Sequence, residues 1–200
     1  MGWTCNVSST ARKGWALAGQ GQVEEGIAQI RQGLAAFRAT GAELHRPCVL
    51  ALLAEAYGKV GQTEGGLAVL AEASAAAHRA GERWCEAELH RLKGELLLKI
   101  EDRRSRSSIL DPLSLASPEE CFHQAINIAR RQETKSLELR AVMSLSRLLQ
   151  KQGKREAARK LLAEVYGWFT EGFDTTDLKE ARALLEELAG CPLGRRDTVG

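Results

Sequence analysis

The amino-acid sequence predicts an all-α protein, folded as a right-handed α-α superhelix (a solenoid) of about four helix pairs plus a C-terminal cap helix. Three observations predict this fold class. Ala, Leu, Glu, Arg and Gln are abundant in the 200 residues, which hold four Pro and two Tyr, and this composition favours helix over strand. A glycine-centred turn recurs along the chain, and the apolar residues between turns follow helical spacing.

The recurring turn carries the sequence Gly-Gln-x-Glu. Gly21 and Gly61 occupy the same place in two copies, 61 − 21 = 40 residues apart, and Gly153 occupies it in a third. Glycine tolerates the left-handed backbone that satisfies the last carbonyl groups of a helix, and the acidic residue favours the positive N-terminus of the next helix. Gly41 and Gly81 end the longer helices in the same way. These turns predict repeated helical hairpins.

Apolar residues spaced along one helix face occur on both sides of a turn: Leu50, Leu53, Tyr57 and Val60 before it, and Leu67, Leu70 and Ala73 after it. We expect helices near residues 9–20, 23–40, 43–60, 63–80, 83–101, 118–132, 135–152, 154–170 and 176–189. Residues 1–190 are expected to form a single helical repeat domain with a polar insertion at about 102–117. Residues 191–200 are expected to form a C-terminal tail.

Two clusters admit two interpretations each. The arginines and serines of residues 103–108 would contact phosphates or form a phosphorylated switch, but a solvated insertion, ending at an N-cap Ser117 and a first-turn Pro118, is favoured. Trp168 and Phe169, beside Tyr166, would form a stacking platform or, as we expect, would pack between the last helix pair and the cap helix.

The composition describes an ordinary water-soluble globular protein, with 44% apolar and 27% charged residues. The formal net charge of +2 is too small to indicate nucleic acid or an anionic membrane as a partner. No stretch reaches the roughly 18 apolar residues of a membrane span, and the start of the chain lacks the apolar core of a signal peptide. The five cysteines are scattered, which favours reduced thiols and a cytoplasmic location.

Candidate chemistry is sparse. The mixed pairs Cys85 with His90 and Cys121 with His123 are spaced so that their members fall on different helix faces, which favours packed thiols and surface histidines over metal ligands. His45 and His78 have no carboxylate or nucleophile companion in the sequence. We therefore expect no catalytic residue, no cofactor and no metal site.

Two stretches resemble the tetratricopeptide repeat (TPR), a helical hairpin with a pattern of large, small and aromatic residues. The residues that fit are Leu53, Ala54, Tyr57, Gly61, Gly66, Leu70 and Ala73 in one stretch, and Val142, Leu145, Ser146, Leu149, Gly153, Ala158 and Leu162 in the other. The runs at 26–34, 52–58, 91–98 and 166–173 are similar to the C-terminal repeats of large bacterial signalling proteins. In those proteins an adenylate or guanylate cyclase, or a LuxR-type DNA-binding domain, is joined to an ATPase module and then to the repeats.

This resemblance, which covers roughly residues 12–190, implies a non-catalytic protein–protein interaction module that acts as the regulatory or sensing segment of a bacterial signalling protein. Its partner would be a protein or peptide, or the ATPase and effector domains of a parent protein. The chain has no Gly-x-x-x-x-Gly-Lys-Ser/Thr phosphate loop, so the resemblance does not extend to catalysis. The alternatives are a scaffold that self-associates through its terminal hairpin, and a retained fragment of a cyclase or ATPase enzyme without its catalytic domains.

In TPR folds the first helix of each pair lines the concave groove, so the resemblance also implies a set of groove residues. They are Trp15 in the first pair, Glu55 and Lys59 in the second, Arg91, Glu95 and Lys99 in the third, and Arg140, Met143, Arg147, Gln150 and Lys151 in the fourth. In the third pair Leu89-Leu92-Leu96 and His90-Gly94-Leu97 both fit the repeat. The basic fourth-pair helix would bind an acidic peptide or a chain-terminal carboxylate, although an ordinary solvated helix face fits the same residues.

Overall fold

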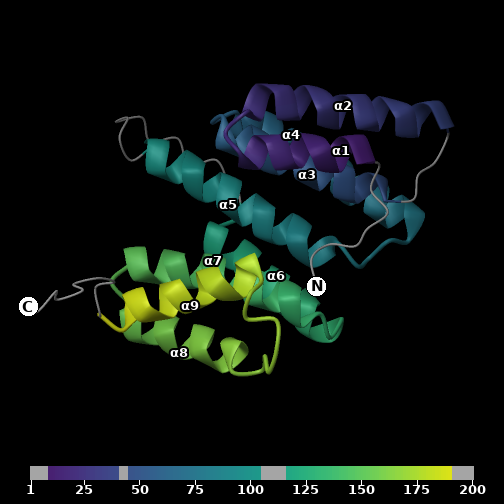
Figure 1. Ribbon diagram of the computed structural model, residues 1–200. Coiled ribbons are helices and arrows are strands. Elements are labelled where there is room, and N and C mark those ends of the chain that lie inside the picture. The colour runs from purple at the N-terminus through teal and green to yellow at the C-terminus, as the bar shows by residue number, and fades with distance from the viewer. Residues whose placement is uncertain (1–8, 41–44, 105–115, 191–200) are drawn as a thin grey trace, which may run out of the picture.

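The computed structural model describes residues 9–40, 45–104 and 116–190, and these residues form nine α-helices and no strand (Figure 1). The helices are α1 (Ser9–Gly19), α2 (Val23–Thr40), α3 (Arg46–Lys59), α4 (Thr63–Ala80), α5 (Glu86–Arg104), α6 (Pro118–Arg131), α7 (Lys135–Lys151), α8 (Arg155–Tyr166) and α9 (Thr176–Leu188). None of these described helices combines the length and apolar character that crossing a lipid bilayer requires.

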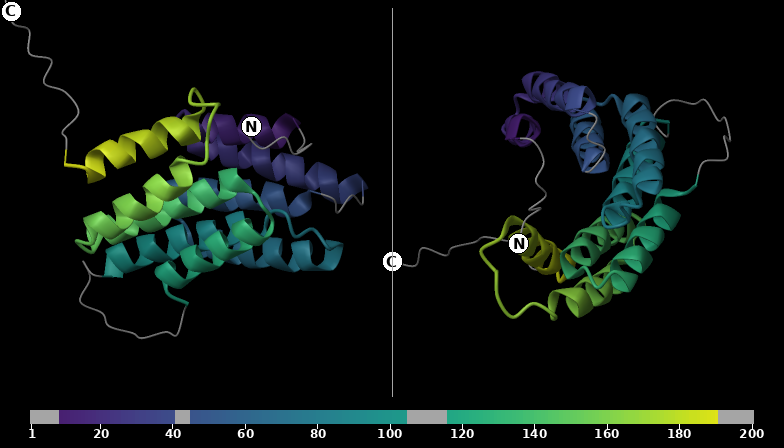
Figure 2. Two further views of the ribbon diagram at one scale, coloured as in Figure 1. Left: turned by 90° about the horizontal axis from the view of Figure 1, so that it is seen from below. Right: turned by 90° about the vertical axis from the view of Figure 1, so that its right-hand side faces the viewer.

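Neighbouring helices pack as four hairpins, α1–α2, α3–α4, α5–α6 and α7–α8, and each hairpin packs against the next. The first helices of successive pairs also contact one another, so α1, α3, α5, α7 and finally α9 follow one another along one side of the stack. Figure 2 shows that the stack bends into an arc, with α1 and α2 at one end and α8 and α9 at the other. The predicted all-α solenoid of four pairs and a cap helix is confirmed for the described residues.

Left-handed glycines close the turns as predicted. The φ angles are 92° at Gly21, 76° at Gly61, 67° at Gly81 and 80° at Gly153. At the second of these turns the backbone N–H of Gln62 donates to the carbonyl of Tyr57 at 3.0 Å, which satisfies a carbonyl group that the end of α3 leaves without a helical partner. Gly41 lies outside the described residues.

The polar insertion begins later than predicted, because α5 continues to Arg104 instead of ending near residue 101. Arg103 holds this last turn: its Nε donates to the carbonyl of Lys99 at 3.4 Å, and its guanidinium also donates to the Thr63 hydroxyl. Residues 105–115 of the insertion lie outside the described residues. The predicted cap of α6 is confirmed, since the Ser117 hydroxyl accepts from the Glu120 N–H at 3.1 Å and the Glu120 carboxylate accepts from the Ser117 N–H at 3.0 Å.

Two other helices are shorter than predicted. The third begins at Arg46 rather than near residue 43. The eighth ends at Tyr166 rather than near residue 170, because the backbone N–H groups of Trp168 and Phe169 turn back to the carbonyls of Val165 and Tyr166 and leave the helical hydrogen-bond pattern. Residues 167–175 consequently form an irregular segment that leads into α9.

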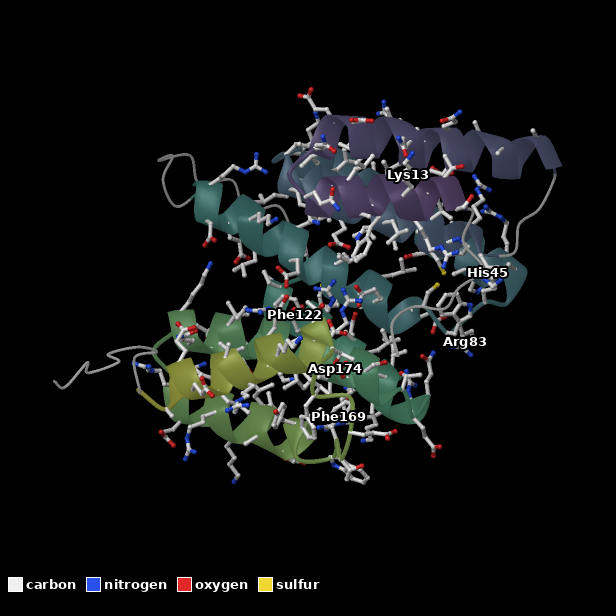
Figure 3. The ribbon with its side chains drawn as sticks, viewed as in Figure 1. Lys13, His45, Arg83, Phe122, Phe169 and Asp174 are labelled. Atoms are coloured by element: carbon white, nitrogen blue, oxygen red, sulfur yellow. The ribbon has the colours of Figure 1, made fainter. Side chains whose placement is uncertain are left out.

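Large side chains cross between helices and fit into gaps left by glycines. Leu96 of α5 lies against Gly58 of α3 and Gly66 of α4, where a Cβ atom on either glycine would come within 2.8 Å of its methyl groups. Phe122 of α6, which is fully buried, lies against Gly94 of α5, where a Cβ would come within 2.5 Å of the ring (Figure 3). The core therefore requires the absence of a side chain at these glycines.

Replacing Gly94 by alanine is expected to destabilise the fold by about 1–3 kcal/mol, because the fully buried Phe122 ring has to move away from the new methyl group. The matched control is Gly65→Ala in α4, where the nearest atom to an added Cβ is 4.0 Å away. The control is expected to stabilise the chain by about 0.4–1 kcal/mol. Urea unfolding of both variants measures the two effects, and equal effects of the same sign would contradict this packing.

Candidate functional site

The concave side of the arc contains a groove of about 1180 Å³. It is lined by Arg12, Trp15, Ala16, Cys48, Ala51, Leu52, Glu55, Glu88, Leu92, Ser136, Leu139, Arg140, Phe169, Glu171, Gly172, Thr175, Thr176, Asp177 and Leu178. These residues come from α1, α3, α5, α7, the segment 167–175 and the first turns of α9. The bend of the stack places α1 and α9 on opposite sides of the arc (Figure 2), and residues of both line the groove.

The floor of the groove is apolar. Ala51 and Leu52 of α3, Leu92 of α5 and Leu139 of α7 line it, and all except the half-buried Leu52 are buried. All four residues stand on the first helices of their pairs, so the packing of these first helices forms the floor of the groove. Apolar surface of this kind, with a few placed polar groups, is typical of binding sites.

Two aromatic side chains stand in the walls of the groove. Trp15 of α1 is 40% exposed. Its indole N–H donates to the Glu55 carboxylate of α3 at 2.9 Å, and the Lys59 ammonium lies 3.5 Å from the same carboxylate and 5.9 Å from the centre of the indole ring. Phe169 stands at the far end of the arc, in the segment 167–175 (Figure 3). The orientation of Trp15 is therefore held by α3, while the residue stays partly exposed to the groove.

An ion network joins α5 to α7 beneath the groove. The carboxylate of Glu88, 2% exposed, accepts from Arg91 at 2.6 and 2.9 Å and lies 3.2 Å from Nη1 of Arg140. Arg91 also reaches Glu95 at 3.4 Å, and the Ser144 hydroxyl of α7 donates to Glu95 at 2.7 Å. These contacts pair the buried charges with one another, which buried ions require.

The pKa values of this network follow its geometry. Burial by itself would raise the pKa of Glu88, but the charges of Arg91 and Arg140 outweigh it and hold the pKa of Glu88 below its ordinary value. In Arg91 the loss of water would lower the pKa, and the attraction of Glu88 reverses this, so that the pKa is raised. Both side chains are therefore charged at neutral pH.

Asp177 extends the network to α9, but its pairing is looser. Its carboxylate lies 3.9 Å from Nε of Arg140 and its side chain is 42% exposed. Partial burial raises the pKa of Asp177, the neighbouring Arg140 lowers it less, and the negative charges of Glu88 and Glu180 raise it further. The wall formed by α9 consequently holds a carboxylate whose negative charge is only partly compensated.

The structure distributes the eleven predicted groove residues unevenly. Trp15, Glu55 and Arg140 line the groove. Lys59, Arg91 and Glu95 stand beside it and hold these residues or Glu88 in place. Lys99 lies outside the groove lining, where its ammonium donates to the carbonyl of Gly58 at 3.0 Å. Met143 is 3% exposed and packs in the core of the C-terminal half, so a groove contact for Met143 is corrected to a core contact.

The last three predicted residues face other helices rather than the groove. Arg147 lies 3.3 Å from Glu180 of α9, the Gln150 amide donates to Glu187 of α9 at 2.8 Å, and Lys151 lies 2.8 Å from Asp102 of α5. The acidic cap helix thus lies along the basic side of α7. The positive charges that predicted an acidic partner already have acidic neighbours within the chain.

The sequence analysis missed Arg12, Glu88, Glu171 and Asp177, and it named Phe169 only in the alternative of a stacking platform. Glu88 was missed because it lies before Arg91, the first residue of the third pair that the TPR resemblance places in the groove. Glu171 and Asp177 were missed because the repeat pattern places no residues after the fourth hairpin on the concave side. The signal available in the sequence was the acidic cap helix, whose charge is opposite to that of α7.

The other candidate residues carry structural roles. Cys48, Cys85 and Cys121 are buried, and the described residues contain no group of His, Cys, Asp and Glu that would hold a metal ion. Trp168 does not pack in the core as we expected. It is 66% exposed, because the early end of α8 turns it outward, and the Lys135 ammonium lies 4.3 Å from the centre of its ring. Phe169 is partly buried against the C-terminal core.

Solved structures with the same fold contain TPR-like repeats. Two crystal structures of a kinesin light chain-like protein from Podosopora anserina, with nearly identical TPR-like repeats, superpose on this chain with TM-scores of 0.61 and 0.60. Sequence identity is 16% in both, and the alignments cover 92% of this chain and 85% and 86% of those chains. A likeness at this identity shows a TPR-like fold. The sequence matches no model of a protein family and no curated protein.

Replacing Glu88 by glutamine is expected to destabilise the fold by about 3 kcal/mol at neutral pH, because Arg91 and Arg140 lose their buried counter-charge. Since the folded-state pKa of Glu88 is lowered, its stabilising effect is complete above the ordinary value of 4.5 and is lost as the pH falls through the lower folded-state pKa. The difference in unfolding free energy between wild type and variant should therefore shrink as the pH falls.

The matched control is Glu86→Gln in the first turn of the same helix, where the partner Arg83 is 78% exposed. An exposed pair contributes at most about 1 kcal/mol. Denaturant unfolding at several pH values gives both free energies, and a Glu88→Gln effect as small as that of Glu86→Gln would refute the role of the network.

Proposed function

We propose that this chain is a non-catalytic interaction module that binds a segment of another protein in its concave groove. The observation that carries the proposal is the groove itself, an apolar floor with an open volume of about 1180 Å³. Sites for small molecules occupy roughly 300–1,000 Å³, so the groove is large enough for several consecutive side chains of a polypeptide. The TPR-like fold, in which the first helices of the pairs line one side, supports the same proposal.

The polar side chains of the groove are organised before any partner binds. Glu88 is held by Arg91 and Arg140, and Trp15 is held by Glu55. Side chains that are already fixed lose little conformational entropy on binding, which favours affinity. Exposed aromatic residues beside buried apolar surface are also the residues that contribute most at protein interfaces.

A non-catalytic role agrees with the chemistry of the groove. Cys48, the thiol of the lining, is completely buried. Glu88 is committed to two arginines, and the described residues of the lining include no histidine that would act as a general base toward Ser136 or a threonine. These features support binding rather than turnover.

We further propose that residues 1–190 act as one repeat domain, in the cytoplasm, as the regulatory or sensing part of a bacterial signalling protein. The support is the resemblance of the runs at 26–34, 52–58, 91–98 and 166–173 to the repeats of cyclase-linked and LuxR-type proteins. Binding in the groove would regulate attached domains only if the partner binds two states of the protein with different affinity.

The two alternatives have less support. A self-associating scaffold would use an apolar surface on the first hairpin, but the large exposed apolar side chain in the described part of that hairpin, Trp15, faces the groove. A retained fragment of a cyclase or ATPase enzyme without its catalytic domains would also be helical throughout the described residues, so the helical fold does not favour it over a binding module. The concave groove remains the better candidate.

The proposal is tested by filling the groove. Ala16 of α1 is exposed and lines the groove, so Ala16→Trp occupies part of it without disturbing the core. Dodecapeptides selected from a random display library on the wild-type chain should bind Ala16→Trp at least about tenfold more weakly. The control Ala28→Trp, at an exposed position of α2 outside the groove, should bind them as the wild type does. Peptides that bind all three proteins equally, or a failure to select any peptide, would overturn the proposed function.

A further inference from the structure

The charged side chains that line the groove are predominantly acidic. Among the described residues, the lining has two arginines, Arg12 and Arg140, and four carboxylates, Glu55, Glu88, Glu171 and Asp177. The chain as a whole has a formal net charge of +2, so the negative balance belongs to this surface and not to the protein in general. A groove with local negative charge attracts a segment with positive charge.

The four carboxylates differ in how far other side chains compensate them. Glu88 is enclosed by Arg91 and Arg140, and Glu55 by Lys59 and the Trp15 indole N–H. Asp177 has Arg140 at 3.9 Å, and Arg140 lies closer, at 3.2 Å, to Glu88. Asp177 is thus the more distant of the two carboxylates that share the Arg140 guanidinium. The pKa of Asp177 is raised mainly by burial, and the negative charges of Glu88 and Glu180 add to this.

The neighbourhood of Asp177 adds further negative charge. Glu171 lies in the same wall, on the segment 167–175, and its side chain is exposed. The apolar floor with Leu52 and Leu92 belongs to the same groove. One wall therefore offers carboxylates, while the floor offers apolar contact.

We propose that the groove binds a protein segment in which a lysine or arginine is flanked by apolar side chains, with the cation paired to Asp177 and the apolar side chains placed on Leu52, Leu92 and Leu139. This inference rests on the proposed function and specifies the partner. An acidic segment would meet Glu171 and Asp177 with like charge, which is unfavourable at an interface. The basic side of α7 offers it no compensation, because α9 and α5 already place Glu180 and Asp102 there.

The test uses peptides from the display selection that bind the wild-type chain and lose affinity for Ala16→Trp. These peptides are expected to be enriched in a lysine or arginine next to apolar residues. Asp177→Asn removes the charge and keeps the shape, and it should weaken their binding about tenfold, as expected for one charged contact. The control is Asp174→Asn, at an exposed position of the preceding segment 167–175 that does not line the groove (Figure 3).

A substitution in the peptide shows whether Asp177→Asn weakens binding through the lost charge or through an effect on the fold of α9. Replacing the lysine or arginine of the peptide by methionine should weaken binding to the wild-type chain and should leave Asp177→Asn with little further effect, because both changes remove the same contact. Raising the salt concentration should weaken the original peptide more than its methionine version.

The outcomes distinguish this inference from the proposed function. The preference for a cationic segment would be overturned if the peptides that lose affinity for Ala16→Trp were acidic or uncharged. It would also be overturned if Asp177→Asn and Asp174→Asn had equal effects. In both cases the proposed function, a groove that binds protein segments, would still hold. Additive effects of the peptide and protein changes would overturn the preference for a cationic segment in the same way. Peptides that bind without regard to Ala16→Trp would instead overturn the groove as the binding site.

Discussion

The buried carboxylate of Glu88 fixes α5 against α7, and the groove depends on that pairing. Glu88 and Arg91 stand on α5, Arg140 on α7, and Asp177 on α9 is the next charge in the series. A buried ion has to be paired, and an ion network of this kind specifies one relative position of its helices even where apolar residues would be equally stable. The floor residues Leu92 and Leu139 come from the same two helices. The network therefore joins the two helices that carry these floor residues.

The apolar packing produces the arc that the ion network completes. Leu96 fits between the glycines of the second pair, and Phe122 fits against Gly94, so α5 is packed closely on both sides. When the first helices of successive pairs lie close together and the second helices lie farther apart, a stack of hairpins bends. Solenoids form concave surfaces through this bend. At the end of the stack, α9 lies along the basic side of α7 and brings Asp177 and the segment 167–175 to the wall opposite α1. Stability and binding surface therefore arise from the same contacts.

Most of the fold was predictable, because its determinants are local. The turn glycines, the cap at Ser117 and Pro118, and the helical spacing of apolar residues each depend on a few neighbouring positions. In the third pair two registers fitted the repeat, because α5 packs on two sides. Leu92 and Leu96 pack toward the first pairs, while Gly94 packs against Phe122 of α6, which belongs to the core of the C-terminal half. The candidate site was predicted only in part. Trp15, Glu55 and Arg140 follow from the repeat register, but Glu171 and Asp177 reach the groove only through the bend of the whole stack, which no local pattern encodes.

The most direct test of the central claim is to locate a bound peptide on the chain by methyl NMR. A peptide selected on the wild-type chain should show intermolecular contacts to the leucine methyl groups of the groove floor, Leu52, Leu92 and Leu139. Leu67 of α4, which lies outside the groove lining, should show none. Contacts to Leu67 with no contacts to the three floor leucines would place the binding surface on the other side of the solenoid and would contradict the account.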